Sequence, residues 1–242
     1  MTSTDGRSKL RKGGRELIIP TQALAMRFRI ELEETNPLVW REIEVPGDAS
    51  FWDLHVAIQD AMGWLDYHLH QFTVPHPRTR RPLTFGIHNL LQDCDDPPGW
   101  ATQIATVFTV SNPTGRYLYD FGDDWWHTIR LVAVFKRDFT VRYPRCIGGA
   151  RACPPEDCGG VSSYAEIVAG TLDEDTRRWL PHGYDLPTLT QQWCASAIRG
   201  GGWPTPGMGI PKPGTPRTKI RLALLWVVGH RIHVAAPWRG AT

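Results

Sequence analysis

The stretch MRFRIELEETNPLVWREIEVPGDASFWDLHVAIQDAMG, residues 26–63, decides the fold of this chain. Its first eight residues alternate strictly between apolar and charged side chains, which is the pattern of a strand buried on one face. The apolar positions after Met26 are Phe28, Ile30 and Leu32. Asn36-Pro37 interrupts this strand, and residues 39–45 are predicted to form its antiparallel partner.

A helix is predicted directly after the two strands, at residues 51–62. Ser50 suits the N-cap position, and Asp53 stands three residues later, where a capping box needs an acceptor. Gly63 occupies the position at which helices end in a left-handed conformation. The apolar residues at helical spacing are Phe51, Leu54, Ile58, Met62 and Leu65. We expect this face to pack against the first strand, because each element has one apolar face to bury.

The remainder of the chain predicts further strands and helices around this opening unit. The strand candidates are residues 68–74, 117–121 and 127–135, the last two as a hairpin. The helix candidates are residues 163–172, with Ser163 and Glu166 as a capping pair, and residues 173–180. The stretches predicted to be irregular are residues 75–99 and 143–160. The fold class is therefore α+β: a single compact domain with a mixed or antiparallel sheet, one main helix packed on one face, and an irregular C-terminal tail.

Composition narrows the class of protein. The chain has 242 residues, 41% of them hydrophobic, and 11 tryptophans, which excludes collagen, a coiled coil and wholesale disorder. Its longest apolar run, residues 222–228, is far shorter than the ~20 residues that a membrane span needs. The polar, basic N-terminus has no apolar signal segment, so the sequence predicts a cytoplasmic protein without membrane association.

Charge is distributed unevenly along the chain. Residues 1–20 carry five basic and two acidic residues, residues 21–185 carry 15 basic and 23 acidic residues, and residues 186–242 carry seven basic residues and no acidic one. We predict a basic flexible arm at residues 1–20, a folded domain at residues 21–193, and a poorly ordered, Pro/Gly-rich basic tail at residues 194–242. The basic ends are candidates for contact with nucleic acid or are solvated tails, and the acidic middle does not suit phosphate.

Residues 117–127 form the first constellation that could carry chemistry. Asp120, Asp123 and Asp124 stand close to His127 in this segment, beside five aromatic residues. Carboxylate and imidazole groups together suit a divalent metal or general acid/base catalysis, so these four residues are catalytic candidates. The alternative is a hairpin whose aspartates cap the turn and whose aromatic rings fill the core.

His68 and His70 form the second constellation. Two residues apart on a strand, both imidazoles would lie on one face, and His127 faces inward by the same alternation. The three histidines are therefore candidate ligands of one metal ion, or else hydrogen-bonded core histidines.

Cys146, Cys153 and Cys158 form the third constellation, with the spacing C-x6-C-x4-C. Three thiolates and one histidine would complete a tetrahedral Zn²⁺ site. The spacing is not that of the paired C-x2-C zinc knuckle. The alternatives are three small buried residues in a loop, or a disulfide.

Several of these stretches resemble the Ri-plasmid ORF-three-like family. The stretches that carry the resemblance are residues 39–41, 54–64, 68–72, 119–127 and 143–160. It covers roughly residues 25–193. The resemblance implies a compact α+β domain carried on plasmids and mobile elements of bacteria or archaea, and it implies no established activity. Some members are labelled resolvase-like, but this chain has no serine-nucleophile motif followed by a pair of DNA-binding helices.

Two hypotheses of function follow. The first is a non-catalytic accessory or binding module of a plasmid or mobile element. The second is a metal-dependent hydrolase or nuclease in which a divalent metal such as Zn²⁺ activates water. Its residues would be His68, His70, Asp120, Asp123, Asp124 and His127. The sequence has no Walker loop, dinucleotide fingerprint or nucleophile elbow, which argues against nucleotide hydrolysis and serine esterase chemistry.

Overall fold

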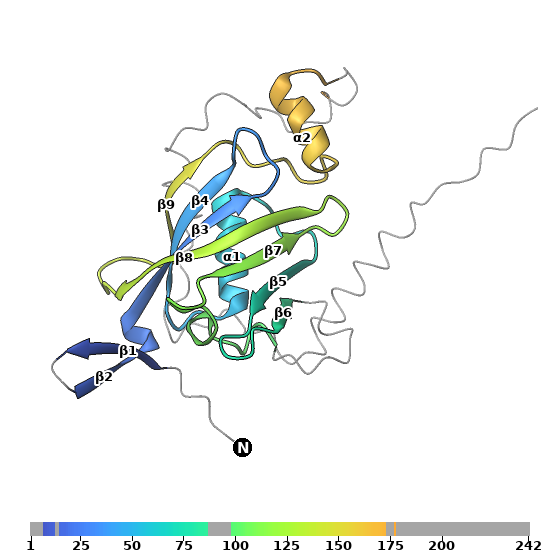
Figure 1. Cartoon of the computed structure of the whole chain (residues 1–242). Helices are drawn as coiled ribbons and strands as arrows, with labels where there is room; N and C mark the ends of the chain where they lie inside the picture. The colour runs from blue at the N-terminus through green and yellow to red at the C-terminus, as the bar shows by residue number, and fades with distance from the viewer. Residues whose placement is uncertain (1–6, 13–14, 87–97, 173–176, 178–242) are drawn as a thin grey trace, which may run out of the picture. The chain divides into compact units, whose positions relative to one another are not determined.

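The computed structural model describes residues 7–12, 15–86, 98–172 and 177. All of these residues lie in the first of the two units, Met1–Gly202 and Trp203–Thr242, into which the chain divides. The described residues form a seven-stranded antiparallel sheet with one long helix, α1 (Phe51–Met62), behind it (Figure 1). A second helix, α2 (Gly160–Ala169), follows the last strand.

The strands of the main sheet follow one another in the order β6-β5-β7-β8-β3-β4-β9, and each pairs with its neighbours in antiparallel fashion. Their bounds are β3 (Leu24–Leu32), β4 (Trp40–Pro46), β5 (His70–Pro75), β6 (Pro82–Gly86), β7 (Thr114–Tyr119), β8 (Trp125–Lys136) and β9 (Arg145–Ala150). Two short 3-10 helices, η1 (Thr21–Ala23) and η3 (Ile104–Thr106), complete this part. The sequence predicted a mixed or an antiparallel sheet, and the sheet is antiparallel. The described residues contain more strand and less helix than the predicted α+β fold suggested.

The opening unit forms as the sequence predicts. β3 pairs with β4, with Phe28 opposite Ile43. The Ser50 side chain accepts a hydrogen bond from the backbone N–H of Asp53, and the Asp53 carboxylate accepts one from the backbone N–H of Ser50. Gly63 ends α1 with φ of 89°, a conformation that costs glycine little because it has no Cβ. The two caps therefore set the length of α1.

The core lies between α1 and the sheet. Leu65, which the sequence placed on the same face, lies beyond the end of α1 and is 45% exposed, so its prediction was wrong. Six other side chains that were predicted to meet are buried in one apolar cluster, which confirms the prediction for them. They are Leu54, Ile58 and Met62 of α1 and Phe28, Ile30 and Leu32 of β3. Phe51 extends this cluster at the first turn of α1, stacking on Phe85 of β6 with ring centroids 4.0 Å apart. The helix therefore joins the central strands to one edge of the sheet.

A buried arginine ties α1 to the other edge. Arg41 of β4 is 2% exposed, and its guanidinium donates to the carbonyl oxygens of Ala61, Ala150 and Arg151 at 2.8 to 3.0 Å. It also donates to its neighbour's carbonyl, that of Trp40, at 2.7 Å. Burial lowers the pKa of Arg41. Because the carbonyl of Ala61 lies in the last turn of α1, the cation also meets the negative end of the helix dipole.

Two edge strands were missed by the sequence analysis. β6 lies within residues 75–99 and β9 within residues 143–160, both predicted to be irregular. Each pairs with one neighbour, β6 with β5 and β9 with β4. Both contain glycine, and β6 also begins with proline, so neither shows the alternation by which central strands are found.

The second helix starts earlier than predicted, so the predicted capping pair is wrong. α2 begins at Gly160, after Gly159 in a left-handed conformation with φ of 92°. Ser163 therefore lies inside the helix, where its hydroxyl donates to the carbonyl of Gly159 at 3.2 Å. The helix candidate at residues 173–180 lies outside the described residues apart from Arg177.

The N-terminal arm differs from the flexible segment predicted at residues 1–20. β1 (Arg7–Lys12) and β2 (Arg15–Pro20) pair as an antiparallel hairpin. The sequence signal was present, because Gly13-Gly14 is typical of two-residue hairpin turns and β2 contains two isoleucines. The predicted tail, residues 194–242, lies outside the described residues.

The packing of α1 gives the first prediction. Truncation of Leu54, Leu54→Ala, should lower the free energy of unfolding by about 2–5 kcal/mol, because it removes buried methyl groups and leaves a cavity. Urea denaturation measures the change. Val132→Ala is the matched control, since Val132 is half exposed on β8 and should change stability by less than about 0.5 kcal/mol. Equal losses in both variants would contradict this packing.

The buried guanidinium gives the second prediction. Arg41→Met should lower the free energy of unfolding by about 3 kcal/mol or more, because four carbonyl groups lose the guanidinium as a donor. Arg130→Met, at an exposed position of β8, is the control and should be nearly neutral. A mild effect of Arg41→Met would show that water or other donors replace the guanidinium.

Candidate functional site

Three connections meet at one end of the strands: residues 63–69 between α1 and β5, residues 120–124 between β7 and β8, and residues 151–159 between β9 and α2. The first two are joined by the backbone N–H of Asp120, which donates to the carbonyl of Leu69 at 3.0 Å. The first is joined to the third by the indole of Trp64, which donates to the carbonyl of Pro154 at 2.9 Å. Four stretches that carry the family resemblance, residues 54–64, 68–72, 119–127 and 143–160, contribute to this junction.

His68 lies at the centre of the junction. Its Nε2 is 2.8 Å from Oδ1 of Asp157, 3.5 Å from Oδ2 of Asp120 and 3.9 Å from Oε2 of Glu156. The His68 and Asp120 side chains are largely buried, whereas the Asp157 side chain is 57% exposed. One imidazole therefore faces three carboxylates, with solvent on the side of Asp157.

The surrounding backbone fixes two of these carboxylates. Oδ1 of Asp120 accepts a hydrogen bond from the backbone N–H of Gly122 at 2.9 Å, which leaves Oδ2 turned toward His68. Oε1 of Glu156 accepts one from the backbone N–H of Leu65 at 2.7 Å, and the Tyr119 hydroxyl donates to the same carboxylate. Burial raises the pKa of Glu156 and also that of Tyr119.

The geometry of this group suits a divalent cation. One ligand atom from each of His68, Asp120 and Asp157 lies within 4.8 Å of the other two. Bonds of ~2.0–2.2 Å to a tetrahedral ion put ligand atoms about 3.4 Å apart, so small side-chain movements would complete the site. Of these three residues, the sequence analysis named His68 and Asp120 as candidates and missed Asp157. Asp157 directly precedes Cys158, in the stretch that the sequence indicated only for its cysteines.

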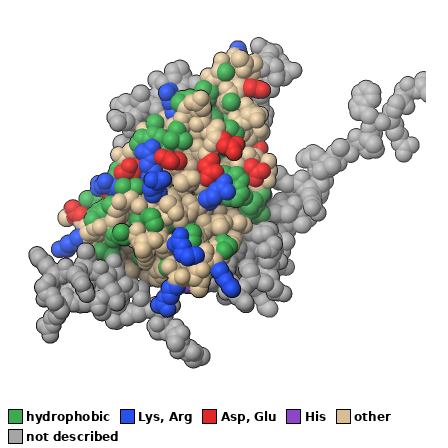
Figure 2. Space-filling view, viewed as in Figure 1, with side chains coloured by type: hydrophobic (Ala, Val, Ile, Leu, Met, Phe, Trp, Pro, Cys, Tyr) green, Lys and Arg blue, Asp and Glu red, His purple; other side chains and the backbone are tan. Residues whose placement is uncertain are grey.

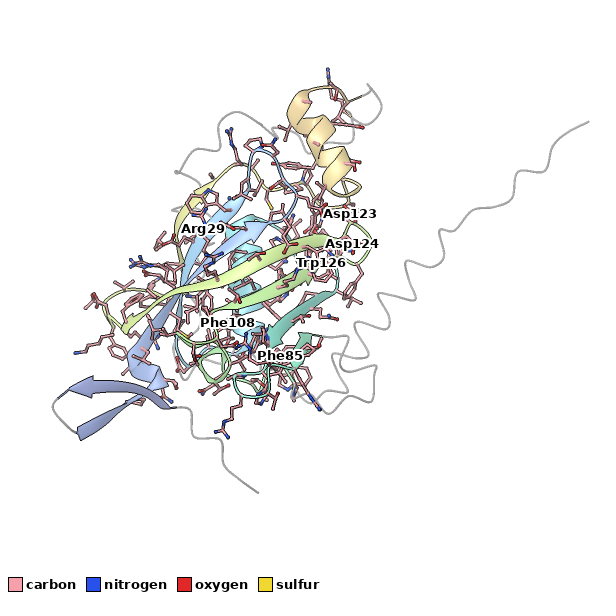
Figure 3. All side chains as sticks on the ribbon, viewed as in Figure 1. Arg29, Phe85, Phe108, Asp123, Asp124 and Trp126 are labelled. Carbon is pink, nitrogen blue, oxygen red and sulfur yellow. The ribbon has the colours of Figure 1, made fainter. Side chains whose placement is uncertain are left out.

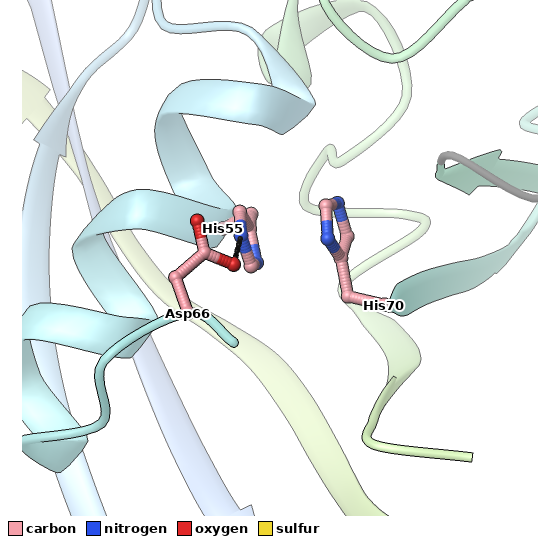
Figure 4. A group of neighbouring side chains, drawn as sticks. All are labelled: His55, Asp66 and His70. Atoms are coloured by element: carbon pink, nitrogen blue, oxygen red, sulfur yellow. Dashed lines mark hydrogen bonds and ion pairs between the residues drawn. The ribbon is translucent and has the colours of Figure 1, made fainter. Parts of the chain in front are cut away.

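His70 lies in a different group, with His55 of α1 and Asp66 (Figure 4). The two imidazoles stack with centroids 3.5 Å apart and planes 11° from parallel. Nδ1 of His55 is 2.8 Å from the Tyr117 hydroxyl, and its Nε2 is 2.9 Å from Oδ1 of Asp66. Ring-nitrogen lone pairs lie in the ring planes, so two stacked rings do not direct them at one ion. The two histidines are buried and Asp66 is exposed, so this group is a hydrogen-bonded cluster at the margin of the core.

His55 and Asp66 were missed by the sequence analysis. The signal for His55 was its position on the apolar face of the predicted helix, four residues after Phe51 and three before Ile58. A histidine there has to be buried and therefore needs a polar partner. Nothing in the sequence indicated that the partner would be Asp66.

His127 lies apart from both groups. Its imidazole is fully buried, edge-on to Trp64 with ring centroids 5.4 Å apart, and Nδ1 is 3.3 Å from the carbonyl of Tyr117. Burial lowers its pKa to about 4, so it is neutral at neutral pH. The predicted meeting of His68, His70 and His127 does not form. β5 begins only at His70, so strand alternation does not relate it to His68, and β7 lies between β5 and β8.

The other two aspartates of the β7–β8 turn are Asp123 and Asp124, which are labelled in Figure 3. Neither belongs to the group of His68, Asp120 and Asp157. Oδ2 of Asp123 accepts a hydrogen bond from the backbone N–H of Gly159 at 3.0 Å, which ties the turn to the start of α2. Asp124 is exposed and has φ of 56°, a left-handed conformation that aspartate tolerates in turns. The contact of Asp123 therefore fits the predicted alternative in which the aspartates of this segment stabilise the turn.

The three cysteines do not present three thiolates together. Cys146 is disulfide-bonded, whereas Cys153 and Cys158 are free and buried. Burial raises the pKa of the Cys158 thiol to about 12 and that of Cys153 further. Because Cys146 is bonded to neither of the other two, the predicted alternative of small buried residues describes Cys153 and Cys158.

The face of the sheet away from α1 carries interspersed basic and acidic side chains (Figure 2). Arg116 pairs with Glu33 through two hydrogen bonds and lies 4.0 Å over the ring of Trp126. Arg29 lies 3.7 Å over the ring of Trp40. The Arg116 hydrogen bonds lower the pKa of Glu33. A paired arginine would have to give up its partner to bind phosphate, so this face does not favour nucleic acid.

Comparisons with known proteins agree with this fold. The model of the plasmid pRiA4b ORF-3-like protein family matches residues 24–190. The chain belongs to this family. It is 31% identical over 179 residues to the uncharacterized protein y4hQ of Sinorhizobium fredii, covering 72% of this chain and 83% of that protein. The crystal structure of MM3350, a protein of unknown function from Methanosarcina mazei, matches with a TM-score of 0.64 and 34% identity, covering 71% of this chain and 97% of that one.

Family membership confirms the resemblance found in the sequence, and the relatives named above have no assigned activity. The predicted nucleic-acid contacts of the basic ends fall mostly on residues whose side chains are not described. In the described part of the chain, no helix is both long and apolar enough to span a membrane.

The burial of His127 gives the third prediction. Its folded-state pKa of about 4 lies below the ~6.5 of an unfolded histidine, so between these pH values only the unfolded chain takes up the proton. The contribution of His127 to stability is therefore complete above about pH 6.5 and falls by about 3 kcal/mol by pH 4. Urea denaturation between pH 7 and pH 4 should show a shallower decline in His127→Gln than in the unmodified chain. Equal declines in the free energy of unfolding of the two proteins would contradict the lowered pKa of His127.

Proposed function

We propose that this chain is a non-catalytic binding module that holds a divalent cation with His68, Asp120 and Asp157. The observation that carries the proposal is the single Nε2 of His68 facing carboxylates from two other connections. The largely buried Asp120 carboxylate and the exposed Asp157 carboxylate both face this nitrogen. A divalent cation bound among these groups would bring opposite charge to the carboxylates.

The donor set indicates which cation fits. Imidazole nitrogen suits Zn²⁺ and other transition metals, whereas carboxylate oxygen also suits Mn²⁺. Glu156, with Oε2 3.9 Å from the same nitrogen, is close enough to supply a further oxygen. We propose Zn²⁺ or Mn²⁺, with solvent on the Asp157 side completing the coordination.

The arrangement favours binding over hydrolysis. Of the six residues of the hydrolase hypothesis, His68 and Asp120 join the cluster, whereas His70 and His127 are held in separate buried contacts. Asp123 is engaged with the start of α2. A hydrolytic site also needs a base beside the activated water, and these contacts place neither of those two histidines in that role.

The setting of the module is part of the same proposal. The family description refers to a plasmid, and we propose that the module accompanies a plasmid or another mobile element.

Metal titration gives the fourth prediction. Isothermal titration of the full chain with ZnCl₂ and with MnCl₂ should show one site, and Asp120→Asn should weaken binding by at least about tenfold. Asparagine keeps an oxygen for the N–H of Gly122 and tolerates the left-handed φ of 56°, so the turn should persist. Asp124→Asn in the same turn is the control and should bind as the unmodified chain does.

Absence of binding by both metals would overturn the proposed cation site. Cation-dependent cleavage of a nucleic-acid or phosphodiester substrate that Asp120→Asn abolishes would instead support the hydrolase hypothesis.

A further inference from the structure

Three large apolar side chains are exposed around the junction of connections. They are Leu65 at 45%, Tyr67 at 49% and Phe121 at 39% of their full exposure. Leu65 and Tyr67 lie between α1 and β5, and Phe121 lies in the β7–β8 turn.

These two connections are held side by side. The backbone N–H of Tyr67 donates to the Tyr119 hydroxyl at 3.0 Å, and that of Asp120 donates to the carbonyl of Leu69 at 3.0 Å. Leu65 is fixed in the same way, because its N–H donates to Glu156. The neighbouring Trp64 side chain is buried in the core, whereas the Leu65 and Tyr67 side chains of the same connection remain exposed. Fixed, exposed apolar side chains are typical of interaction surfaces.

The charge of this surface has one sign. We define the loop edge as residues 63–69, 120–124 and 154–159, which contain six carboxylates and no lysine or arginine, whereas the exposed Arg151 lies earlier in the third connection. Asp66, Asp124 and Asp157 are exposed, Asp123 and Glu156 are partly buried, and Asp120 is buried. This contrasts with the open face of the sheet, where arginine and glutamate are paired. Nucleic acid and anionic lipid would be repelled by the loop edge.

We propose that the loop edge docks a basic polypeptide segment of a partner protein, one that carries aliphatic or aromatic side chains between its lysines and arginines. The carboxylates would pair with the cationic groups, and Tyr67 and Phe121 would receive the apolar side chains and the faces of guanidinium groups. Complementary charge speeds association and sets specificity, while the apolar contacts supply affinity. Asp66, Asp124, Tyr67 and Phe121 lie outside the proposed cation group, so this inference does not depend on the proposed cation.

The test is an unbiased selection of ligands. A phage library of random 12-residue peptides is selected on the full chain, and the enriched peptides are synthesised and their affinities measured by fluorescence anisotropy with and without EDTA. We expect enriched peptides to combine Lys or Arg with aliphatic or aromatic residues. Their affinity should fall at least tenfold for the double variant Tyr67→Ala/Phe121→Ala and for Asp66→Asn/Asp124→Asn. Phe139→Ala, at an apolar side chain 72% exposed elsewhere, is the control and should bind as the unmodified chain does.

Several outcomes would overturn the inference. They are a selection without enrichment, enrichment of acidic peptides, and affinities that the two double variants leave unchanged or that Phe139→Ala lowers equally. Self-association of the chain that Tyr67→Ala/Phe121→Ala abolishes would assign the loop edge to a second copy and also overturn it. Circular dichroism of each variant checks that the fold is retained. Peptide binding that persists in EDTA, with no metal binding in titration, would support the inference while overturning the proposed cation site.

Discussion

The guanidinium of Arg41 is the constraint on which the candidate site depends. It joins the last turn of α1 to the end of β9 by hydrogen bonds to the carbonyls of Ala61 and Ala150. One connection of the junction starts at the end of that helix, and another starts at the end of that strand. Arg41 therefore fixes the starting points of the segments that carry His68 and Asp157. The buried guanidinium is stable there because it donates a hydrogen bond to each of these carbonyl oxygens.

The fold separates charged groups into three settings. On the open face of the sheet, arginine and glutamate pair with each other and with tryptophan rings. In the interior, His55 and His127 are held among aromatic rings with hydrogen bonds to Tyr117. At the loop edge, carboxylates gather around His68 without a lysine or arginine. Of these three settings, the loop edge is the one with an excess of negative charge. The proposed cation and the proposed basic partner would therefore both bind there.

Part of the site could be found from the sequence. Asp120 was recognised as a candidate because it stands near His127 in one segment, and His68 because it stands two residues from His70 in a predicted strand. Asp157 and Glu156 were missed, since they are far along the chain from His68 and reach it only because β9 and α2 fold back beside it. His127 was wrongly placed with His68 and His70. Alternation gives the face on which a side chain lies, but it does not give the order of strands, and β7 separates β5 from β8.

The sequence by itself determined the local units: the pairing of β3 with β4, the ends of α1 at Ser50 and Gly63, and the apolar face of Leu54 and Ile58. These depend on interactions between residues close in the chain, whose signals are periodicity, capping side chains and glycine. The tertiary structure alone decided which connections meet, which histidines stay separate, and that β6 and β9 become edge strands. Apart from the pairing of β6 with β5, these outcomes depend on contacts between residues far apart in the chain, and no local pattern records them. Gly159 with Asp123 and Arg41 with Arg151, for example, are 36 and 110 positions apart.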